Sequence, residues 1–354
     1  MNGYERNWRE ALSGATVAIT GGGGLVGSRI AAQLRTSGAR VISVGKLDAY
    51  PSAVYGDLFG VRADDPDVVV GDIADAVLMA DVVARSDYVI HAAAVADVAA
   101  CTRNPMAAVQ TNIEGTQVLL DTVARNNDRI RRFVFVSSAA VYGNGDPKRM
   151  DIQAWPENQP LSPLSVYANS KLWGEHQTSL VLGRANVAHT TVRYFSVYGE
   201  PQTVKQGSHS WVVAWLAMRA KLGLPMQLNG GGHQVRDLTH VDDIATATIL
   251  SMIAPGTRGQ VLNVGTGRGT AIREVADRIK GYFPDAPIVT TPLPEGDPLG
   301  GYADTRQMSA ALGWEPMISV EVGIERYVAW LNATPNALPL WLREEAAQDG
   351  AGAA

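Results

Sequence analysis

Tyr167 and Lys171 stand four residues apart in Ser-Val-Tyr-Ala-Asn-Ser-Lys, and Ser138 lies upstream in Val-Ser-Ser-Ala-Ala-Val-Tyr-Gly. The i to i+4 spacing places the phenol and the ammonium on one face of a helix. A lysine held there stabilises a phenolate, which lowers the tyrosine pKa from about 10 toward neutral and lets the residue act as a base. A serine from a separate strand can hydrogen-bond a reacting hydroxyl or carbonyl oxygen. This interpretation is specific only if a dinucleotide site precedes the three residues.

A glycine-rich turn indicates such a site. Residues 15–20 predict a buried strand, residues 28–37 predict a helix, and Gly21, Gly24 and Gly27 form a G-x-x-G-x-x-G pattern between them. In this context the backbone N–H groups and the helix dipole can receive a pyrophosphate. A turn without a ligand is the alternative, and the strand–turn–helix context favours the dinucleotide site.

The composition is that of an ordinary soluble α/β enzyme, with 18% charged residues and a net charge of −5. Because no long Lys/Arg cluster occurs, nucleic acid and anionic membrane are poor candidates for partners. The single cysteine, Cys101, lies in an alanine-rich stretch and is expected to be a small packing residue. No paired Cys/His pattern suggests a metal site.

The chain ends predict a cytoplasmic protein. Residues 1–10 are polar and charged, which argues against a signal peptide, and no apolar run approaches about 18 residues. Residues 346–354 lack bulky apolar side chains and are expected to fray.

Alternating elements in the first half predict a Rossmann-type α/β fold with a doubly wound parallel sheet. Strands are expected at residues 40–44, 67–70, 87–91 and 132–137, and a helix at residues 105–125. We expect a dinucleotide-binding domain over residues 14–201, with residues 235–267 returning to it. Residues 202–234 and 268–331 should form a smaller α/β substrate lobe, and residues 332–354 a tail. A substrate would lie between the lobes, at the carboxyl ends of the strands.

The chain closely resembles the extended short-chain dehydrogenase/reductase family, in particular its nucleotide-sugar epimerases and dehydratases. The resemblance runs from about Thr16 to Trp330, and its motifs occur in the family order. They are Thr20-Gly21-Gly22 to Gly27, Gly71-Asp72-Ile73, His91-Ala92-Ala93-Ala94, Asn112 in Thr-Asn-Ile-Glu-Gly-Thr, Ser137-Ser138 to Tyr142-Gly143, Tyr167 to Lys171, Arg193 to Gly199, Arg236-Asp237 to Asp242-Asp243, and Asn263-Val264-Gly265.

The resemblance implies an NAD(P) site. It assigns the adenine contact to Asp72 and gives His91 a structural place. The remaining cofactor-binding residues that it implies are Gly21, Gly24, Leu25, Val26, Gly27, Ile73, Ala92, Ala93, Ala94, Asn112, Tyr167 and Lys171.

The end of the second strand bears on the choice between NAD and NADP. Relatives that prefer NAD carry an acidic residue there, whereas this chain has Gly45 followed by Lys46. Loss of the carboxylate and gain of an ammonium favour a 2′-phosphate, so NADP is slightly favoured. A solvated Lys46, with NAD bound and Asp48 replacing the carboxylate, is the alternative.

The resemblance also implies the chemistry. Tyr167 removes a proton from a sugar hydroxyl as hydride passes to the nicotinamide, Lys171 lowers the tyrosine pKa and holds the nicotinamide ribose, and Ser138 hydrogen-bonds the same oxygen. Sugar-nucleotide 4,6-dehydratases place an Asp-Glu pair directly after this serine, where this chain has Ala139 and Ala140. We therefore predict a nucleotide-sugar epimerase, acting at C4 through a transient 4-keto intermediate. An NADP-dependent reductase or dehydrogenase of a carbonyl compound, or a sugar-nucleotide dehydratase, is the alternative.

Substrate contacts are implied for Ser138, Ser196 and Arg236, with Arg236 gripping the nucleotide diphosphate. Two departures from the family pattern concern that grip. Ser196 replaces an asparagine, and Pro294 stands where a second arginine usually precedes Gly-Asp. Lys205 or Arg268 could compensate. Trp211 and Trp215 are expected in the core of the small lobe rather than in a sugar-stacking platform.

Helices that begin near Pro105 and Pro163 carry apolar residues on more than one face. In relatives these two helices pair across a dimer axis, so a homodimer is expected. Burial within one subunit is the alternative explanation.

Overall fold

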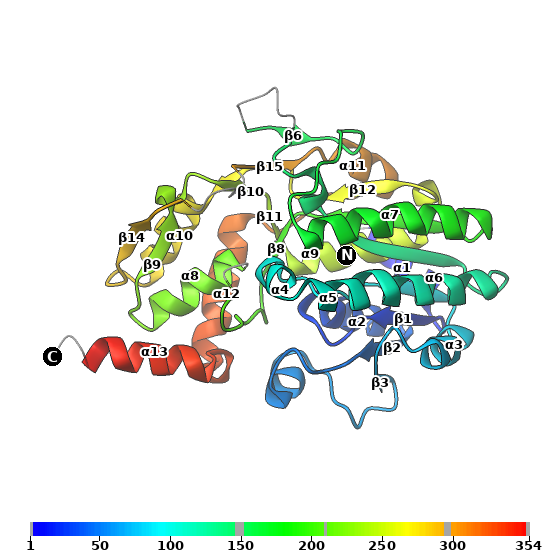
Figure 1. Cartoon of the computed structure of the whole chain (residues 1–354), viewed down its shortest axis with the longest axis horizontal. Helices are drawn as coiled ribbons and strands as arrows, with labels where there is room; N and C mark the ends of the chain where they lie inside the picture. Colours follow the sequence, from blue (N-terminus) through cyan, green and yellow to red (C-terminus); the bar gives the residue numbers. More distant parts are fainter. Residues whose placement is uncertain (1–2, 146–151, 209–210, 294–298, 352–354) are drawn as a thin grey trace.

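The computed structural model describes residues 3–145, 152–208, 211–293 and 299–351. It shows a large lobe built around a parallel sheet and a smaller lobe beside it (Figure 1). Seven strands form the large sheet in the order β12-β7-β5-β4-β1-β2-β3. Their bounds are β1 (Thr16–Thr20), β2 (Arg40–Gly45), β3 (Val68–Val70), β4 (Tyr88–His91), β5 (Arg132–Ser138), β7 (His189–Tyr194) and β12 (Val261–Val264).

Helices cover both faces of this sheet because its strand residues alternate between two apolar cores. Val17 and Ile19 of β1 belong to one core, whereas Ala18 between them belongs to the other. The first core also contains residues of α1 (Gly3–Leu12), α2 (Leu25–Arg35) and α9 (Val241–Ile253). The second contains residues of α3 (Ala76–Ala84), α6 (Thr116–Arg125) and α7 (Val166–Arg184). The predicted doubly wound Rossmann fold is confirmed.

The smaller lobe has a core of its own, in which Trp215, Leu216, Val275, Ile324 and Leu342 pack together. Its strands β9 and β14 pair in parallel. Its elements are α8 (Val212–Lys221), β9 (Met226–Asn229), α10 (Ile272–Tyr282), β14 (Ile288–Thr291), α12 (Val320–Ala333) and α13 (Leu340–Ala351).

Short strands lie where the lobes meet (Figure 1). β8 (Ser196–Tyr198) pairs with β11 (Leu238–His240). A second small sheet has the order β13-β10-β15-β6, with bounds Thr270–Ala271, Val235–Arg236, Gly300–Ala303 and Ala154–Trp155. The remaining α-helices in the described ranges are α4 (Val98–Arg103), α5 (Pro105–Ala108) and α11 (Arg306–Leu312).

Two segments differ from the expectation. The helix predicted over residues 105–125 is divided into α5, a π-helical turn at Val109–Gly115, and α6. Residues 332–351, expected as a tail, complete α12 and then form α13, whose Leu342 is fully buried. The α8 helix, which follows Trp211, begins at Val212. None of the described helices is both long and apolar enough to cross a membrane.

Candidate active site

A cavity of about 1490 Å³ lies between the lobes and is lined by residues of both. It brings together most of the predicted site, namely Gly21, Gly24, Leu25, Val26, Gly27, Lys46, Asp72, Ile73, Ala92, Ala93, Ala94, Ser138, Tyr167, Lys171, Ser196 and Arg236. Asn112 is the predicted site residue that does not line it. The cavity therefore lies at the carboxyl ends of β1, β2, β4 and β5, where open α/β sheets bind their ligands.

Ser138 and Tyr167 meet at one end of this cavity. Ser138 is the last residue of β5, and its Oγ accepts a hydrogen bond of 3.1 Å from the N–H of Ala140. Tyr167 lies in the first turn of α7, where Ser165 caps the helix through its hydroxyl. The Ser138 and Tyr167 side chains both line the cavity, and Ser138 lowers the pKa of the phenol by hydrogen bonding. Both hydroxyls can therefore contact one oxygen of a bound ligand.

Lys171 is buried behind these two residues. Its Nζ donates to the Val136 carbonyl at 2.8 Å and lies 6.0 Å from the centre of the Tyr167 ring. Burial lowers the pKa of Lys171 to about 8, and the negative Glu175 acts in the opposite direction. Burial raises the pKa of Tyr167 to about 12, although the hydrogen bond with Ser138 opposes the rise. In the protein alone the tyrosine is thus a neutral phenol, in contrast to the lowered pKa that its spacing from Lys171 predicts.

A buried ionic network below the site was missed by the sequence analysis. The Arg193 guanidinium donates to both carboxylate oxygens of Glu175 at 2.9 and 2.7 Å, and Ser137 donates to the same carboxylate at 2.5 Å. Arg193 also donates to the Tyr142 hydroxyl at 2.8 Å. An arginine within a buried strand, β7, and a glutamate four residues after Lys171 were the signals that could have revealed it.

The glycine turn has the shape of a cradle for a diphosphate. Gly21 has φ +75°, and a Cβ on Gly27 would lie 2.2 Å from the Gly21 carbonyl oxygen. The first turn of α2 contains no acidic residue, and its N-cap residue, Gly24, has no side chain that could cap the helix. The turn thus lets a ligand come close to the backbone, and no acidic side chain neutralises the positive end of the α2 dipole. This arrangement fits a dinucleotide pyrophosphate.

At the end of β2, the Lys46 Nζ lies 2.7 Å from Asp72 Oδ2, with 44% and 40% of the two side chains exposed. Both residues line the cavity. This ion pair is a contact that the sequence analysis did not predict. A 2′-phosphate bound by Lys46 would have to share the ammonium with Asp72.

His91 and Asn112 do not line the cavity and lie behind the residues that do. The His91 ring bridges Thr20 Oγ1 at 2.6 Å and Thr116 Oγ1 at 2.9 Å, and Thr116 donates to the Asn112 carbonyl. The Asn112 side chain accepts from the Val95 N–H at 2.8 Å and donates to Ser170 at 3.0 Å. These contacts hold the glycine turn, the Val95 loop and α7 together. His91 is a structural residue, as expected.

Among the substrate residues, Ser196 and Arg236 line the part of the cavity next to the small lobe. Arg236 Nη1 donates to the Val235 carbonyl at 2.8 Å. Pro294 lies outside the described residues, and Arg268 is not part of the cavity wall. Trp211 and Trp215 pack on the core of the small lobe and also line the cavity, so the prediction of a purely core position was incomplete.

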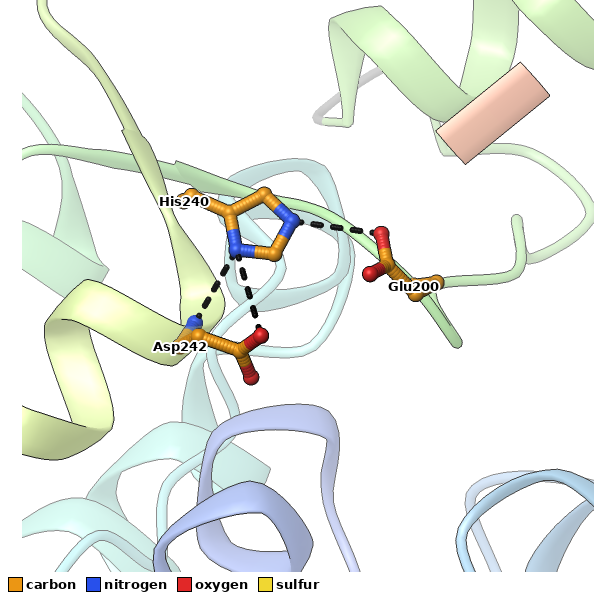
Figure 2. Close-up of side chains that lie close together, drawn as sticks. All are labelled: Glu200, His240 and Asp242. Carbon is orange, nitrogen blue, oxygen red and sulfur yellow. Dashed lines mark hydrogen bonds and ion pairs between the residues drawn. The ribbon is translucent and has the colours of Figure 1, made fainter. Parts of the chain in front are cut away.

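Glu200, His240 and Asp242 form a compact acidic cluster (Figure 2). His240 Nδ1 accepts from the Asp242 N–H at 3.2 Å, and Nε2 lies 3.2 Å from Glu200 Oε2. Two arginines neutralise the carboxylates. Arg326 contacts both at 2.5 and 2.6 Å, and Arg29 contacts Asp242 at 2.5 Å. Since Arg29 belongs to α2 and Arg326 to α12, the cluster is an ionic connection between the lobes rather than a vacant set of metal ligands.

Comparison with known proteins gives the family. The sequence matches the model of the NAD dependent epimerase/dehydratase family over residues 17–265. A dTDP-glucose 4,6-dehydratase of Streptomyces antibioticus is 32% identical over 323 residues, covering 88% of this chain and 91% of that protein. The UDP-glucose 4-epimerase of Thermotoga maritima, solved with UDP-glucose, is 28% identical, with a TM-score of 0.79 and coverage of 90% of this chain and 99% of that one.

The UDP-glucose 4-epimerase of Thermus thermophilus, solved as a complex with NAD, is also 28% identical, with the same TM-score of 0.79 and the same coverage of 90% and 99%. The chain therefore belongs to the NAD-dependent epimerase/dehydratase family, which is of the extended short-chain dehydrogenase/reductase type.

Proposed function

We propose that this protein is an NAD(P)-dependent epimerase of a nucleotide-activated sugar, which inverts C4 through a transient 4-keto intermediate. The observation that carries the proposal is that Ser138 and Tyr167 line the same cavity as the glycine cradle. The family membership and the UDP-glucose 4-epimerases of similar structure support it.

The glycine cradle, Asp72 and Ala92 to Ala94 would hold the cofactor, whose nicotinamide accepts and returns a hydride when it is bound. Tyr167 takes the proton of the C4 hydroxyl as general base and later returns it as general acid. Ser138 hydrogen-bonds the same oxygen as it becomes a carbonyl. Because the pKa of Tyr167 is about 12 in the protein alone, its deprotonation requires positive charge nearby, from Lys171 or from the bound ligands.

Dehydration is the strongest competing reaction, since a relative at 32% identity is a dTDP-glucose 4,6-dehydratase. Elimination of water requires groups that move protons next to the sugar. In this chain Ala139 and Ala140 line the cavity directly after Ser138, within the 3-10 turn Ala139–Tyr142. Methyl groups cannot transfer protons, so this wall favours epimerisation.

The proposal is tested by incubating the purified protein with UDP-glucose and dTDP-glucose and analysing the products by NMR. Inversion at C4 without net formation or consumption of reduced cofactor is the expected result. A 4-keto-6-deoxy product would establish a dehydratase, and stoichiometric consumption of NAD(P)H would establish a reductase.

We further propose a preference for NADP and a homodimer. Lys46 supports the first, because it places an ammonium in the cavity wall where an acidic residue would favour NAD. The second is supported by Met106 of α5 and Leu180 of α7, whose exposed fractions are 60% and 68%. Light scattering of the purified protein tests the dimer.

A further inference from the structure

Lys205 lines the cavity on the segment between β8 and α8. Its Nζ lies 4.3 Å from the centre of the Tyr50 ring and 5.8 Å from that of Trp211. Tyr50 follows β2 of the large lobe, whereas Trp211 packs on the core of the small lobe. The ammonium therefore lies between aromatic rings from the two sides of the cleft.

Tyr50 is itself held in place. Its ring makes edge contacts with Tyr55 and Phe59, at centroid distances of 5.9 and 5.3 Å. Its backbone N–H donates to the Tyr55 hydroxyl at 3.2 Å. Lys205 thus contacts a fixed wall rather than a loose loop.

The other cations that line the cavity already have protein partners. Lys46 pairs with Asp72, Lys171 donates to the Val136 carbonyl, and Arg236 donates to the Val235 carbonyl. Arg103 donates to the Gly207 carbonyl at 3.2 Å. Among the described residues, none gives Lys205 a hydrogen bond or a carboxylate within 4.0 Å. Within the described part of the chain, Lys205 is therefore the cavity-lining cation for which no N–H donor has a protein acceptor.

Cation–π attraction holds the ammonium between the rings but leaves its three N–H donors without acceptors. Burial lowers the pKa of Lys205, whereas Asp97 and Asp48 act in the opposite direction and favour the charged form. A partly buried ammonium with free N–H donors that faces a ligand cavity is stabilised by an anionic oxygen of a ligand.

We propose that Lys205 binds the diphosphate of a nucleotide ligand in this cleft. The inference rests on the proposed function, which supplies two such ligands, the nucleotide sugar and the dinucleotide cofactor. The glycine cradle could offer backbone N–H groups to one diphosphate, and Arg236 lines the same cavity. Lys205 adds a point charge to the cavity wall between the lobes.

The test compares Lys205→Met, which keeps the aliphatic stem between the rings, with Lys205→Arg, which keeps the charge. Lys221→Met is the matched control, because Lys221 lies on α8, donates to Asn332 at 2.6 Å and does not line the cavity. Calorimetric titrations measure the affinity of each protein for UDP, dTDP and NAD. Lys205→Met should weaken one class of ligand by about tenfold or more, while Lys205→Arg retains most of the affinity.

If Lys205→Met loses affinity only for UDP or dTDP, Lys205 binds the substrate diphosphate. If it loses affinity only for NAD, Lys205 binds the cofactor diphosphate. Unchanged affinity for all three ligands in Lys205→Met, or an equal loss in Lys221→Met, overturns the proposal. If the unmodified protein binds NAD but neither UDP nor dTDP, the proposed function fails, and the NAD titrations alone then decide the role of Lys205.

Discussion

At the scale of single residues, the phenol of Tyr167 is the group whose charge state controls the proposed reaction. Burial raises its pKa to about 12, while Lys171 is directed toward the Val136 carbonyl. The Tyr167 phenol therefore becomes a base only when additional positive charge nearby lowers its pKa.

Replacing Tyr167 with phenylalanine removes the oxygen that transfers the proton and keeps the ring. The turnover rate should fall by about 100-fold or more, because general catalysis contributes 10²–10⁴-fold. The cofactor content and the melting temperature should remain close to those of the unmodified protein. Tyr282→Phe, at an exposed position on α10, is the control. A variant that retains more than about a tenth of the rate would remove Tyr167 from the role of base.

Lys46 decides the choice of dinucleotide if it reads a 2′-phosphate. Lys46→Ala should then weaken NADP binding by about tenfold and leave NAD binding almost unchanged. Fluorescence titration with the two reduced dinucleotides measures both affinities. Equal loss for both, or tighter binding of NADH than of NADPH by the unmodified protein, would contradict an NADP preference.

The residues of the site could be predicted to the extent that they form local patterns. The i to i+4 spacing on one helix is enough to predict that Tyr167 and Lys171 act together. One strand–turn–helix unit is enough to predict the glycine turn. The pKa of Tyr167 could not be predicted, because it depends on side chains that bury the phenol from distant parts of the chain. The Glu175–Arg193 pair was missed for the same reason, since β5, β7 and α7 meet only in the fold.

At the scale of elements, the glycine turn has little room for an added side chain. A Cβ on Gly27 would lie 2.2 Å from the Gly21 carbonyl oxygen, so the turn would have to open. Gly27→Ala should therefore lower the affinity for the dinucleotide by at least about tenfold, or about 1.4 kcal/mol. Calorimetric titration provides the measurement.

Gly281→Ala is the matched control, because Gly281 lies in α10 with no atom within 4 Å of an added Cβ. This change should leave the affinity unaltered and stabilise the helix by about 0.5–1 kcal/mol. An unchanged affinity in Gly27→Ala would show that the turn does not cradle the cofactor.

The parallel sheet and the positions of its strands could be predicted from alternating elements, but two helical features could not. The π-helical turn at Val109–Gly115 depends on tertiary contacts, because Asn112 reaches Val95 and Ser170, and Gly115 packs closely on Ile73. The α13 helix depends on Leu342, which is buried only because α13 packs on the small lobe. Sequence periodicity does not report either contact.

At the scale of the whole molecule, buried polar groups connect elements from distant parts of the chain. His91 joins the end of β1 to α6 through Thr20 and Thr116. Burial, together with the positive Lys171, lowers the pKa of His91 to about 3. The folded protein thus keeps this ring neutral, whereas the unfolded chain protonates it below about pH 6.5.

The contribution of His91 to stability is therefore complete above about pH 6.5 and is lost progressively as the pH falls toward 3. Between pH 7 and pH 5 the loss is about 2 kcal/mol. Urea unfolding at these two pH values should show a smaller decrease in His91→Asn than in the unmodified protein. The same decrease in both proteins would mean that His91 does not stay neutral in the fold.

The central claim is a redox-neutral inversion at one carbon of a nucleotide sugar. Its most direct test is NMR and mass analysis of the product formed from the accepted nucleotide sugar in D₂O. Because the hydride removed from C4 returns to C4, we predict a C4 epimer without solvent deuterium on carbon and without net change in reduced cofactor. Deuterium at C3, C5 or C6, or an equivalent of NAD(P)H consumed for each product formed, would contradict it.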